Sequence, residues 1–211
     1  MEIEHTDKFI VFEGIDSEVL ADQAERLNTW LHKNILNVIV TREPTDGPIG
    51  AQCRLALNKR FDIPDFAQAV LLLSDRLDHL YRSDGIIEDI QKGKYIVCIH
   101  YLLSTYAYPY KKVPMEWLQK INRKCRWPDL VIFIDTPVDS VLERQARREG
   151  YDIELWQQKK ELLEEQRERY YQAIEHCQKD GKQTSIIDGN KPADSIQRLC
   201  LTLVKNLGVK K

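Results

Sequence analysis

The stretch Lys8–Leu27 constrains the fold of this 211-residue chain more than any other. It opens with Phe9–Phe12, a short run of β-branched and aromatic residues that is typical of a buried parallel strand. A tight turn follows around Gly14. Beyond the turn, apolar side chains recur at the spacing of one helix face, at Leu20, Ala24 and Leu27. Strand, glycine turn and helix in this order are the setting of a phosphate-binding loop.

The residues that such a loop needs for its chemistry are missing. Counted from Gly14, the motif Gly-x-x-x-x-Gly-Lys-Ser/Thr places its last three positions at Val19, Leu20 and Ala21. Val19 has a branched Cβ where glycine lets the backbone approach a phosphate, Leu20 has no cation, and Ala21 has no hydroxyl for a metal ion. Glu18 adds a negative charge beside the site. We therefore expect phosphoryl transfer through this loop to be lost.

The same segment suits an ordinary helix start. Ser17 can cap the helix, and Glu18 in the first turn complements the positive end of the helix dipole. We expect the helix to begin near Ser17–Glu18, with a compact turn where an open loop would otherwise surround a phosphate.

Short apolar runs alternate with helical patterns along the whole chain. Five of these runs are predicted strands: Phe9–Glu13, Val38–Thr41, Tyr95–Ile99, Leu130–Asp135 and Ser185–Asp188. The alternation predicts an α/β fold with an open, mostly parallel five-stranded sheet and helices on both faces. In such sheets ligands bind at the carboxyl ends of the strands. No repeat or linker interrupts the pattern, so we expect a single domain over residues 1–211.

Composition limits the partners that we expect. The net charge is −2, which gives no indication of a nucleic acid or an anionic membrane as partner. No apolar run approaches the ~18 residues of a membrane span, and the N-terminus has no apolar signal region, so a cytoplasmic location is expected. The five cysteines contain no C-x-x-C pair, which favours reduced, mostly buried thiols.

Two later helices can be placed from their patterns. Pro64–Tyr81 carries apolar residues at alternating spacings of four and three, and these are expected to face the core: Phe66, Val70, Leu73, Leu77 and Leu80. Another helix is expected to follow Thr136, with Thr136 as its cap and Pro137 in its first position.

The segment Glu13–Leu27, EGIDSEVLADQAERL, is similar without a gap to EGIDGSGKSTQAERL, which thymidylate kinases typically carry. TREPTDG, after the second predicted strand, resembles their Thr-Arg-Glu-Pro-Gly motif, and the order and spacing of motifs match over roughly Lys8–Leu207. The resemblance implies a three-layer P-loop NTPase-like fold, a nucleoside monophosphate ligand such as dTMP, and a homodimer. Six consecutive positions, Ser17–Asp22, depart from the family.

The resemblance assigns substrate contacts to four residues that match the family's motifs. Asp16 would bind the deoxyribose hydroxyl and Arg42 the substrate phosphate. Arg76 would contact the thymine base, and Tyr108 would lie under the sugar. The family's base-stacking Phe is Leu72 here, which weakens stacking. Without the resemblance, Arg42 is equally suited to pairing with the neighbouring glutamate, and Arg76 to an isolated place on the surface.

A second departure follows the third predicted strand. Ile99 and His100 stand where the family has an Asp-Arg pair, whose Asp helps to organise magnesium and whose Arg reaches the substrate phosphate. Ile99 can do neither. His100 could donate a hydrogen bond to a phosphate, more strongly if protonated, or be structural. Ser104 and Thr105 keep the family's small hydroxyls.

A basic helix end corresponds to the family's mobile lid, at about residues 144–154. Arg147 and Arg148 match the arginines that stabilise charge on the transferring phosphoryl group. The alternative is a solvated basic helix end, which also suits the helix dipole.

These patterns lead to one hypothesis and two alternatives. We hypothesise a thymidylate-kinase-like protein that is catalytically impaired or inactive and still binds a nucleoside monophosphate. The first alternative is an active kinase of dTMP in which Arg147 or Arg148 replaces the missing Lys, and only this alternative requires ATP and magnesium. The second is a purely structural or interaction protein. No set of metal-ligating side chains is expected.

Overall fold

The computed structural model describes residues 8–34, 37–149 and 153–207, apart from the side chains of residues 148–158. Five strands form one sheet in the order β2-β3-β1-β4-β5, and every pairing is parallel. The strands are β1 Phe9–Glu13, β2 Val38–Arg42, β3 Tyr95–Ile99, β4 Leu130–Asp135 and β5 Ser185–Asp188. All five strand predictions are confirmed, and the second strand extends one residue further, to Arg42.

The central strand β1 is buried on both faces. Successive side chains of a strand point to opposite faces, so Phe9 and Val11 enter one hydrophobic cluster while Ile10 and Phe12 enter another. All four are fully buried. A strand of this kind needs a helical layer on each face, which is why its sequence is apolar throughout.

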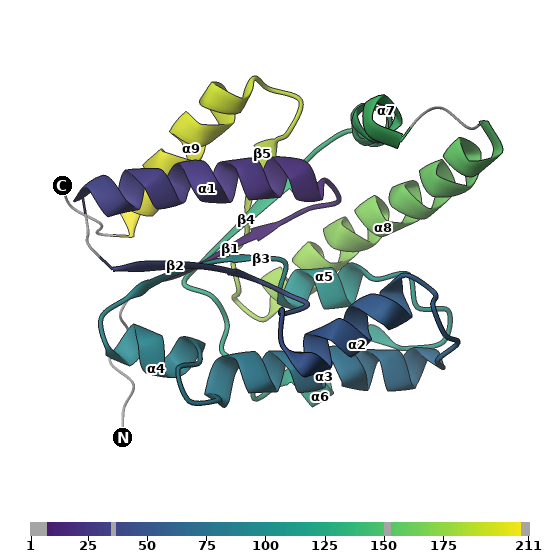
Figure 1. Ribbon diagram of the computed structural model, residues 1–211, viewed down its shortest axis with the longest axis horizontal. Helices are drawn as coiled ribbons and strands as arrows, with labels where there is room; N and C mark the ends of the chain where they lie inside the picture. Colours follow the sequence, from purple (N-terminus) through teal and green to yellow (C-terminus); the bar gives the residue numbers. More distant parts are fainter. Residues whose placement is uncertain (1–7, 35–36, 150–152, 208–211) are drawn as a thin grey trace.

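Two helices, α1 (Ser17–Asn34) and α9 (Ala193–Asn206), cover one face of the sheet (Figure 1). The apolar face of α1 predicted from the sequence is confirmed, because Leu20, Ala24 and Leu27 are fully buried. They pack with Ile10 and Phe12 of the sheet.

The remaining helices are α2 Pro48–Leu57, α3 Asp65–Tyr81, α4 Ile86–Gln91, α5 Leu102–Ala107, α6 Met115–Asn122, α7 Val138–Glu149 and α8 Ile153–Lys179. All of these except α2, which packs on α3, bury the opposite cluster. In Figure 1, α2 to α6 lie on the side of the sheet away from α1 and α9, and α8 passes beside α5. The three-layer arrangement predicted from the sequence is confirmed.

The predicted core face of α3 is right only in its second half, where Leu80 is fully buried and Leu73 and Leu77 are partly buried. Phe66 and Val70 are 44% and 45% exposed, whereas Arg76 and His79 on another face are buried. The helix turns this polar face inward because Glu43, which follows β2, pairs with both Arg76 and His79 there. A buried charge with a bonded partner can replace an apolar side chain at such a position.

Three further features bear on the predictions. The cap predicted at Thr136 is wrong, because its hydroxyl has no hydrogen-bond partner among the described residues and α7 begins at Val138. All five cysteines are free thiols, and four of them are buried. Within the described parts of the chain, no helix combines the length and the apolar character needed to cross a membrane.

Candidate functional site

The turn between β1 and α1 is tightly built. Gly14 has φ +155°, and a Cβ at this position would lie 2.6 Å from the carbonyl oxygen of Ile134. Asp16 then starts the helix: its backbone carbonyl accepts from the Leu20 amide at 3.0 Å, and its Oδ1 accepts from the Val19 amide at 3.3 Å. The predicted compact turn and helix start are confirmed. The cap is Asp16 and not Ser17, whose hydroxyl bonds elsewhere.

Leu20, in the first turn of α1, packs into the core. Its side chain is fully buried against the sheet, and a methyl carbon lies 3.4 Å from the position of a Cβ at Gly14. The position that would carry the phosphate-bridging lysine therefore faces the core. Val19 is partly buried in the same cluster, and Ala21 is exposed on α1.

Asp16 also pairs with Arg144 of α7, whose guanidinium lies 2.5 Å from Asp16 Oδ2. The two line a small cavity of about 190 Å³, here called the helix-start cavity, together with Ser17 and Glu18. The side chain of Asp16 is 4% exposed, and its cationic partner at the start of α1 is Arg144 of the same chain. Arg147 is exposed on α7, whereas the side chain of Arg148 and much of the predicted lid lie outside the described residues.

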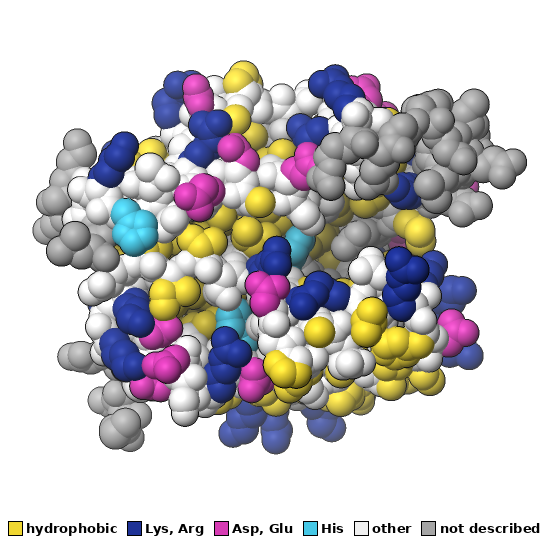
Figure 2. Space-filling view, viewed as in Figure 1, with side chains coloured by type: hydrophobic (Ala, Val, Ile, Leu, Met, Phe, Trp, Pro, Cys, Tyr) yellow, Lys and Arg dark blue, Asp and Glu magenta, His cyan; other side chains and the backbone are white. Residues whose placement is uncertain are grey.

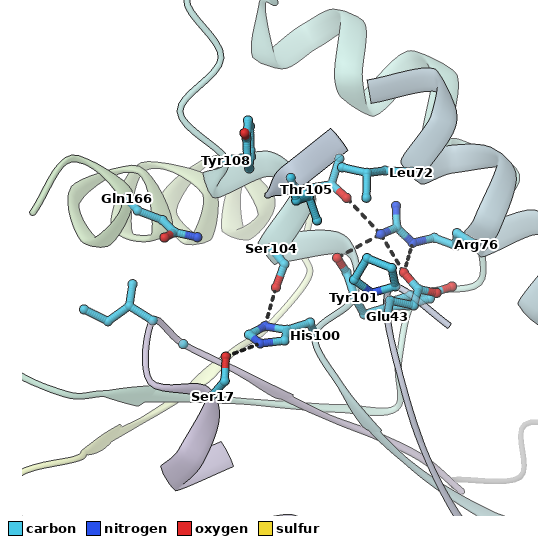
Figure 3. A pocket seen from close by; sticks show the side chains of 14 residues that line it. Ser17, Glu43, Leu72, Arg76, His100, Tyr101, Ser104, Thr105, Tyr108 and Gln166 are labelled. Carbon is cyan, nitrogen blue, oxygen red and sulfur yellow. Dashed lines mark hydrogen bonds and ion pairs between the residues drawn. The ribbon is translucent and has the colours of Figure 1, made fainter. Parts of the chain in front are cut away.

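A larger cavity of about 320 Å³, here called the strand-end pocket, lies where β1, β2 and β3 end (Figure 3). Helices α3, α5 and α8 complete its walls. It brings together seven of the residues selected from the sequence: Gly14, Ser17, Arg76, His100, Ser104, Thr105 and Tyr108. Asp16, Arg42 and Glu18 are not among its lining residues.

Arg76 forms one wall of the strand-end pocket and is 2% exposed. Its Nε donates to Glu43 Oε2 at 2.8 Å, and its Nη1 donates to Asn122 Oδ1 at 2.8 Å. Its Nη2 donates to the Tyr101 carbonyl at 2.9 Å and to Thr105 Oγ1 at 2.8 Å. Burial opposes the charge most strongly of any single cause, but the ion pair and hydrogen bond with Glu43, together with Tyr101 and Cys125, raise the pKa of Arg76. The expected surface position is wrong, and most N–H groups of this arginine are engaged within the protein.

Arg42 lies outside the pocket. Its side chain is 59% exposed and pairs with Asp46 at 2.7 Å. The pairing of Arg42 with Glu43 that the sequence allowed does not form, because Glu43 turns inward to Arg76 and to His79, whose Nδ1 lies 3.2 Å away. The other ring nitrogen of His79 bonds Thr41, so this histidine is a packed, structural one.

The floor of the strand-end pocket is a chain of hydrogen bonds from Ser17 to Glu13. Ser17 Oγ lies 3.1 Å from His100 Nε2, and His100 Nδ1 lies 2.9 Å from Ser104 Oγ (Figure 3). The Ser104 hydroxyl donates to Glu13 Oε2. Burial lowers the pKa of His100 to about 4, so the imidazole is neutral at pH 7. Ser17 and His100, which come from the two departures from the family pattern, thus contact each other.

Glu13, like Gln166, is a site residue that sequence reasoning missed. It is 1% exposed and accepts from the amides of Tyr101 at 3.0 Å and Leu103 at 3.1 Å. The Tyr170 hydroxyl of α8 donates to it at 3.3 Å. Burial raises the pKa of this carboxyl to about 7, although the hydrogen bond from Ser104 lowers it. A carboxylate that ends a wholly apolar strand was the available signal.

Tyr108 and Gln166 stand at the open side of the strand-end pocket (Figure 3). Both also line an adjoining hollow of about 570 Å³ beside α2, α3 and α8. They bring a phenol and an amide, which are neutral groups with both donor and acceptor atoms. The pocket is therefore a mixed apolar and polar cleft, open on one side, of the kind that holds a small organic ligand.

Comparison with known proteins identifies the family of this chain. The family model described as thymidylate kinase matches residues 12–199, which is most of the chain. The chain belongs to the thymidylate kinase family. Relatives named "Probable thymidylate kinase" include one from Pyrococcus abyssi, 34% identical over 66% of this chain and 70% of the relative. The relative from Thermococcus kodakarensis is 33% identical over 66% of this chain and 72% of its own length. The relative from Methanococcus aeolicus is 30% identical over 79% of each chain.

The ATP and magnesium that a thymidylate kinase uses do not fit the residues at the start of α1. The position for the bridging lysine is the buried Leu20, and the position for the metal-binding hydroxyl is Ala21. The anion site of the helix is occupied by the carboxylate of Asp16, which already has Arg144 as its partner. Among the described residues there is no cluster of three His, Cys, Asp or Glu side chains that could hold a metal ion.

Proposed function

We propose that this member of the thymidylate kinase family keeps a pocket for a (deoxy)nucleoside monophosphate such as dTMP and has lost most or all ATP-dependent phosphoryl transfer. One observation carries the proposal: Leu20 lies in the core, so no side chain at this position can reach a phosphate. Losing one preorganised group that stabilises charge typically costs about 10²–10³ in rate. Three such groups of the family pattern are replaced in this chain, by Leu20, Ala21 and Ile99.

The strand-end pocket supports the ligand half of the proposal. Its polar wall is held by the buried residues Glu43, Arg76 and Thr105, because Arg76 donates to both of the others, so the cavity needs no ligand to keep its shape. Tyr108 and Gln166 offer neutral polar atoms at its open side. We propose these residues, with Ser104 and His100 below them, as the ligand-binding set.

An active kinase remains the second candidate, and the names of the relatives favour it. In that case a cation of α7 must act in place of the missing lysine. Arg147 is exposed on that helix, and Arg148 follows it in the sequence. A purely structural or interaction protein is the third candidate, and it requires the strand-end pocket to bind nothing.

We also propose that the chain forms a homodimer through α2 and α3. Leu55 on α2 and Phe66 and Val70 on α3 are 43%, 44% and 45% exposed. Figure 2 shows hydrophobic side chains gathered over these helices. Sedimentation should give the mass of a dimer, and Val70→Glu should give a folded monomer. A monomeric parent protein would contradict this proposal.

A coupled assay of dTMP phosphorylation by ATP tests the loss of catalysis. Active kinases turn over at about 1–100 s⁻¹, and we expect a rate far below this range. The double substitution Arg147→Ala and Arg148→Ala is the matched control, because it would abolish an intrinsic rate but not the rate of a contaminating host enzyme. Turnover near 1 s⁻¹ that the double substitution removes would overturn the proposal and establish the second candidate.

A further inference from the structure

We propose that the strand-end pocket recognises the nucleoside part of its ligand and that a 5′-phosphate adds almost nothing to affinity. A neutral nucleoside should therefore bind about as tightly as its monophosphate. This inference rests on the proposed function, since it assumes that the pocket binds a nucleoside-type ligand. It goes further in assigning the binding energy to one part of that ligand.

The charges that line the pocket cancel. Its ionisable lining residues with an ordinary charge at pH 7 are Glu43 and Arg76, which pair with each other at 2.7 Å and are almost fully buried. His100, where the family pattern has an arginine, is neutral because burial lowers its pKa to about 4. A phosphate dianion binds tightly where cations or charge-assisted donors await it. The lining residues that the structure describes offer no cation without a carboxylate partner.

The hydrogen-bond donors on the floor are also engaged. Ser17, His100 and Ser104 have three protons for the three bonds that lead to Glu13. With Glu13 ionised, Ser104 donates to it, so His100 Nδ1 donates to Ser104 and His100 Nε2 accepts from Ser17. Each of these protons is then used within the chain of hydrogen bonds. A phosphate accepts hydrogen bonds only, whereas a sugar hydroxyl can both donate and accept, so the floor suits the hydroxyl.

Two arginines near the pocket are turned to carboxylates of this chain. Arg42 pairs with Asp46 at the surface, and Arg144 pairs with Asp16 in the helix-start cavity. Neither arginine lines the strand-end pocket. A phosphate bound by either arginine would share it with a carboxylate that already pairs with it, which offsets part of the gain.

Calorimetric titration of the full chain with thymidine and with dTMP tests the inference. We expect dissociation constants that agree within about threefold, since one uncompensated cation would shift them by about tenfold or more. A dTMP affinity at least tenfold higher than that of thymidine would overturn the inference and leave the proposed function intact. Binding of neither ligand would overturn both.

A single substitution should make the pocket prefer dTMP over thymidine. His100→Arg places a guanidinium on the floor and should raise the affinity for dTMP about tenfold over thymidine. His100→Gln is the matched control, because it keeps a neutral polar group and should leave the ratio near one. Thermal unfolding checks that both variants fold. If His100→Arg does not fold, Ser17→Lys serves instead, since Ser17 is exposed and lines the same pocket. An unchanged ratio in a folded charged variant would contradict the inference.

Discussion

The helix-start cavity and the strand-end pocket lie at the same edge of the sheet, and they have diverged from the family pattern to different degrees. At the start of α1, the chain has filled the anion site with its own carboxylate, from Asp16, and its own cation, from Arg144. In the strand-end pocket the wall around Arg76 and Glu43 is intact, and the cavity persists. The residues of the pocket wall also hold the core together through buried bonds. If ATP-dependent transfer has been lost as proposed, the loop is free to change, whereas the wall is retained for stability.

The largest expected effect comes from trying to restore the lysine of the loop. Leu20→Lys should lower the free energy of unfolding by about 4 kcal/mol or more, because the ammonium would be buried in an apolar cluster. It should not create ATP binding. Ala21→Lys, one residue later and exposed, is the matched control and should change stability by less than about 0.5 kcal/mol. Denaturant unfolding measures both. A stable Leu20→Lys variant that binds ATP would show that the loop can still open.

The wall of the strand-end pocket should be nearly as sensitive. Arg76→Met leaves the buried Glu43 without its arginine partner, with only His79 beside it, and should cost about 3–5 kcal/mol. Arg42→Met removes an arginine of similar size from an exposed pair and should cost at most about 1 kcal/mol. The two variants should also differ in thymidine binding, which only Arg76→Met should weaken. Equal effects of the two substitutions would contradict the contrast between a structural and a peripheral arginine.

Two groups on the floor of the pocket, Glu13 and His100, should change the free energy of unfolding with pH in opposite directions. Glu13 has a folded pKa of about 7 against 4.5 in a model compound. Its protonated form is favoured by folding, so its contribution is full below pH 4.5 and is lost as the pH rises to 7. The difference in unfolding free energy between the parent protein and Glu13→Gln should therefore fall by about 3 kcal/mol over this range.

His100 should show the reverse trend. Its folded pKa of about 4 lies below the usual 6.5, so its contribution is present above pH 6.5 and is lost as the pH falls towards 4. Between pH 4.5 and 6.5 the two slopes oppose each other in the parent protein. Each single substitution should uncover the slope of the other group. Parallel pH profiles for Glu13→Gln and His100→Gln would contradict the assignment.

The smallest expected effect concerns the helix cap. Asp16→Ala removes the acceptor of the Val19 amide and should cost about 1 kcal/mol, whereas Asp16→Asn keeps an acceptor there and should cost less. Both substitutions remove the ion pair with Arg144. The difference between their unfolding free energies therefore reports the contribution of the helix cap alone. If Asp16→Asn costs as much as Asp16→Ala, the pair and not the cap stabilises this end of α1.

Local patterns were enough to predict the strands and the start of α1. A buried strand and an amphipathic helix each depend on neighbouring residues, so Phe9–Glu13 and Leu20 could be placed from the sequence. Partners distant in the chain could not. Arg76 is buried because Glu43, 33 residues away, meets it, and that contact also explains why Phe66 and Val70 of the predicted core face of α3 are exposed. Glu13 reaches Tyr170 across 157 positions, which no local pattern reveals.

Calorimetric titration of the full chain with dTMP and, separately, with ATP and magnesium tests the central claim most directly. The claim is that the ligand pocket has outlasted the phosphoryl-donor site. We expect dTMP to bind with a Kd of about 0.1–1 mM and ATP with magnesium to give no binding over the same range. An affinity for ATP higher than that for dTMP would contradict the account.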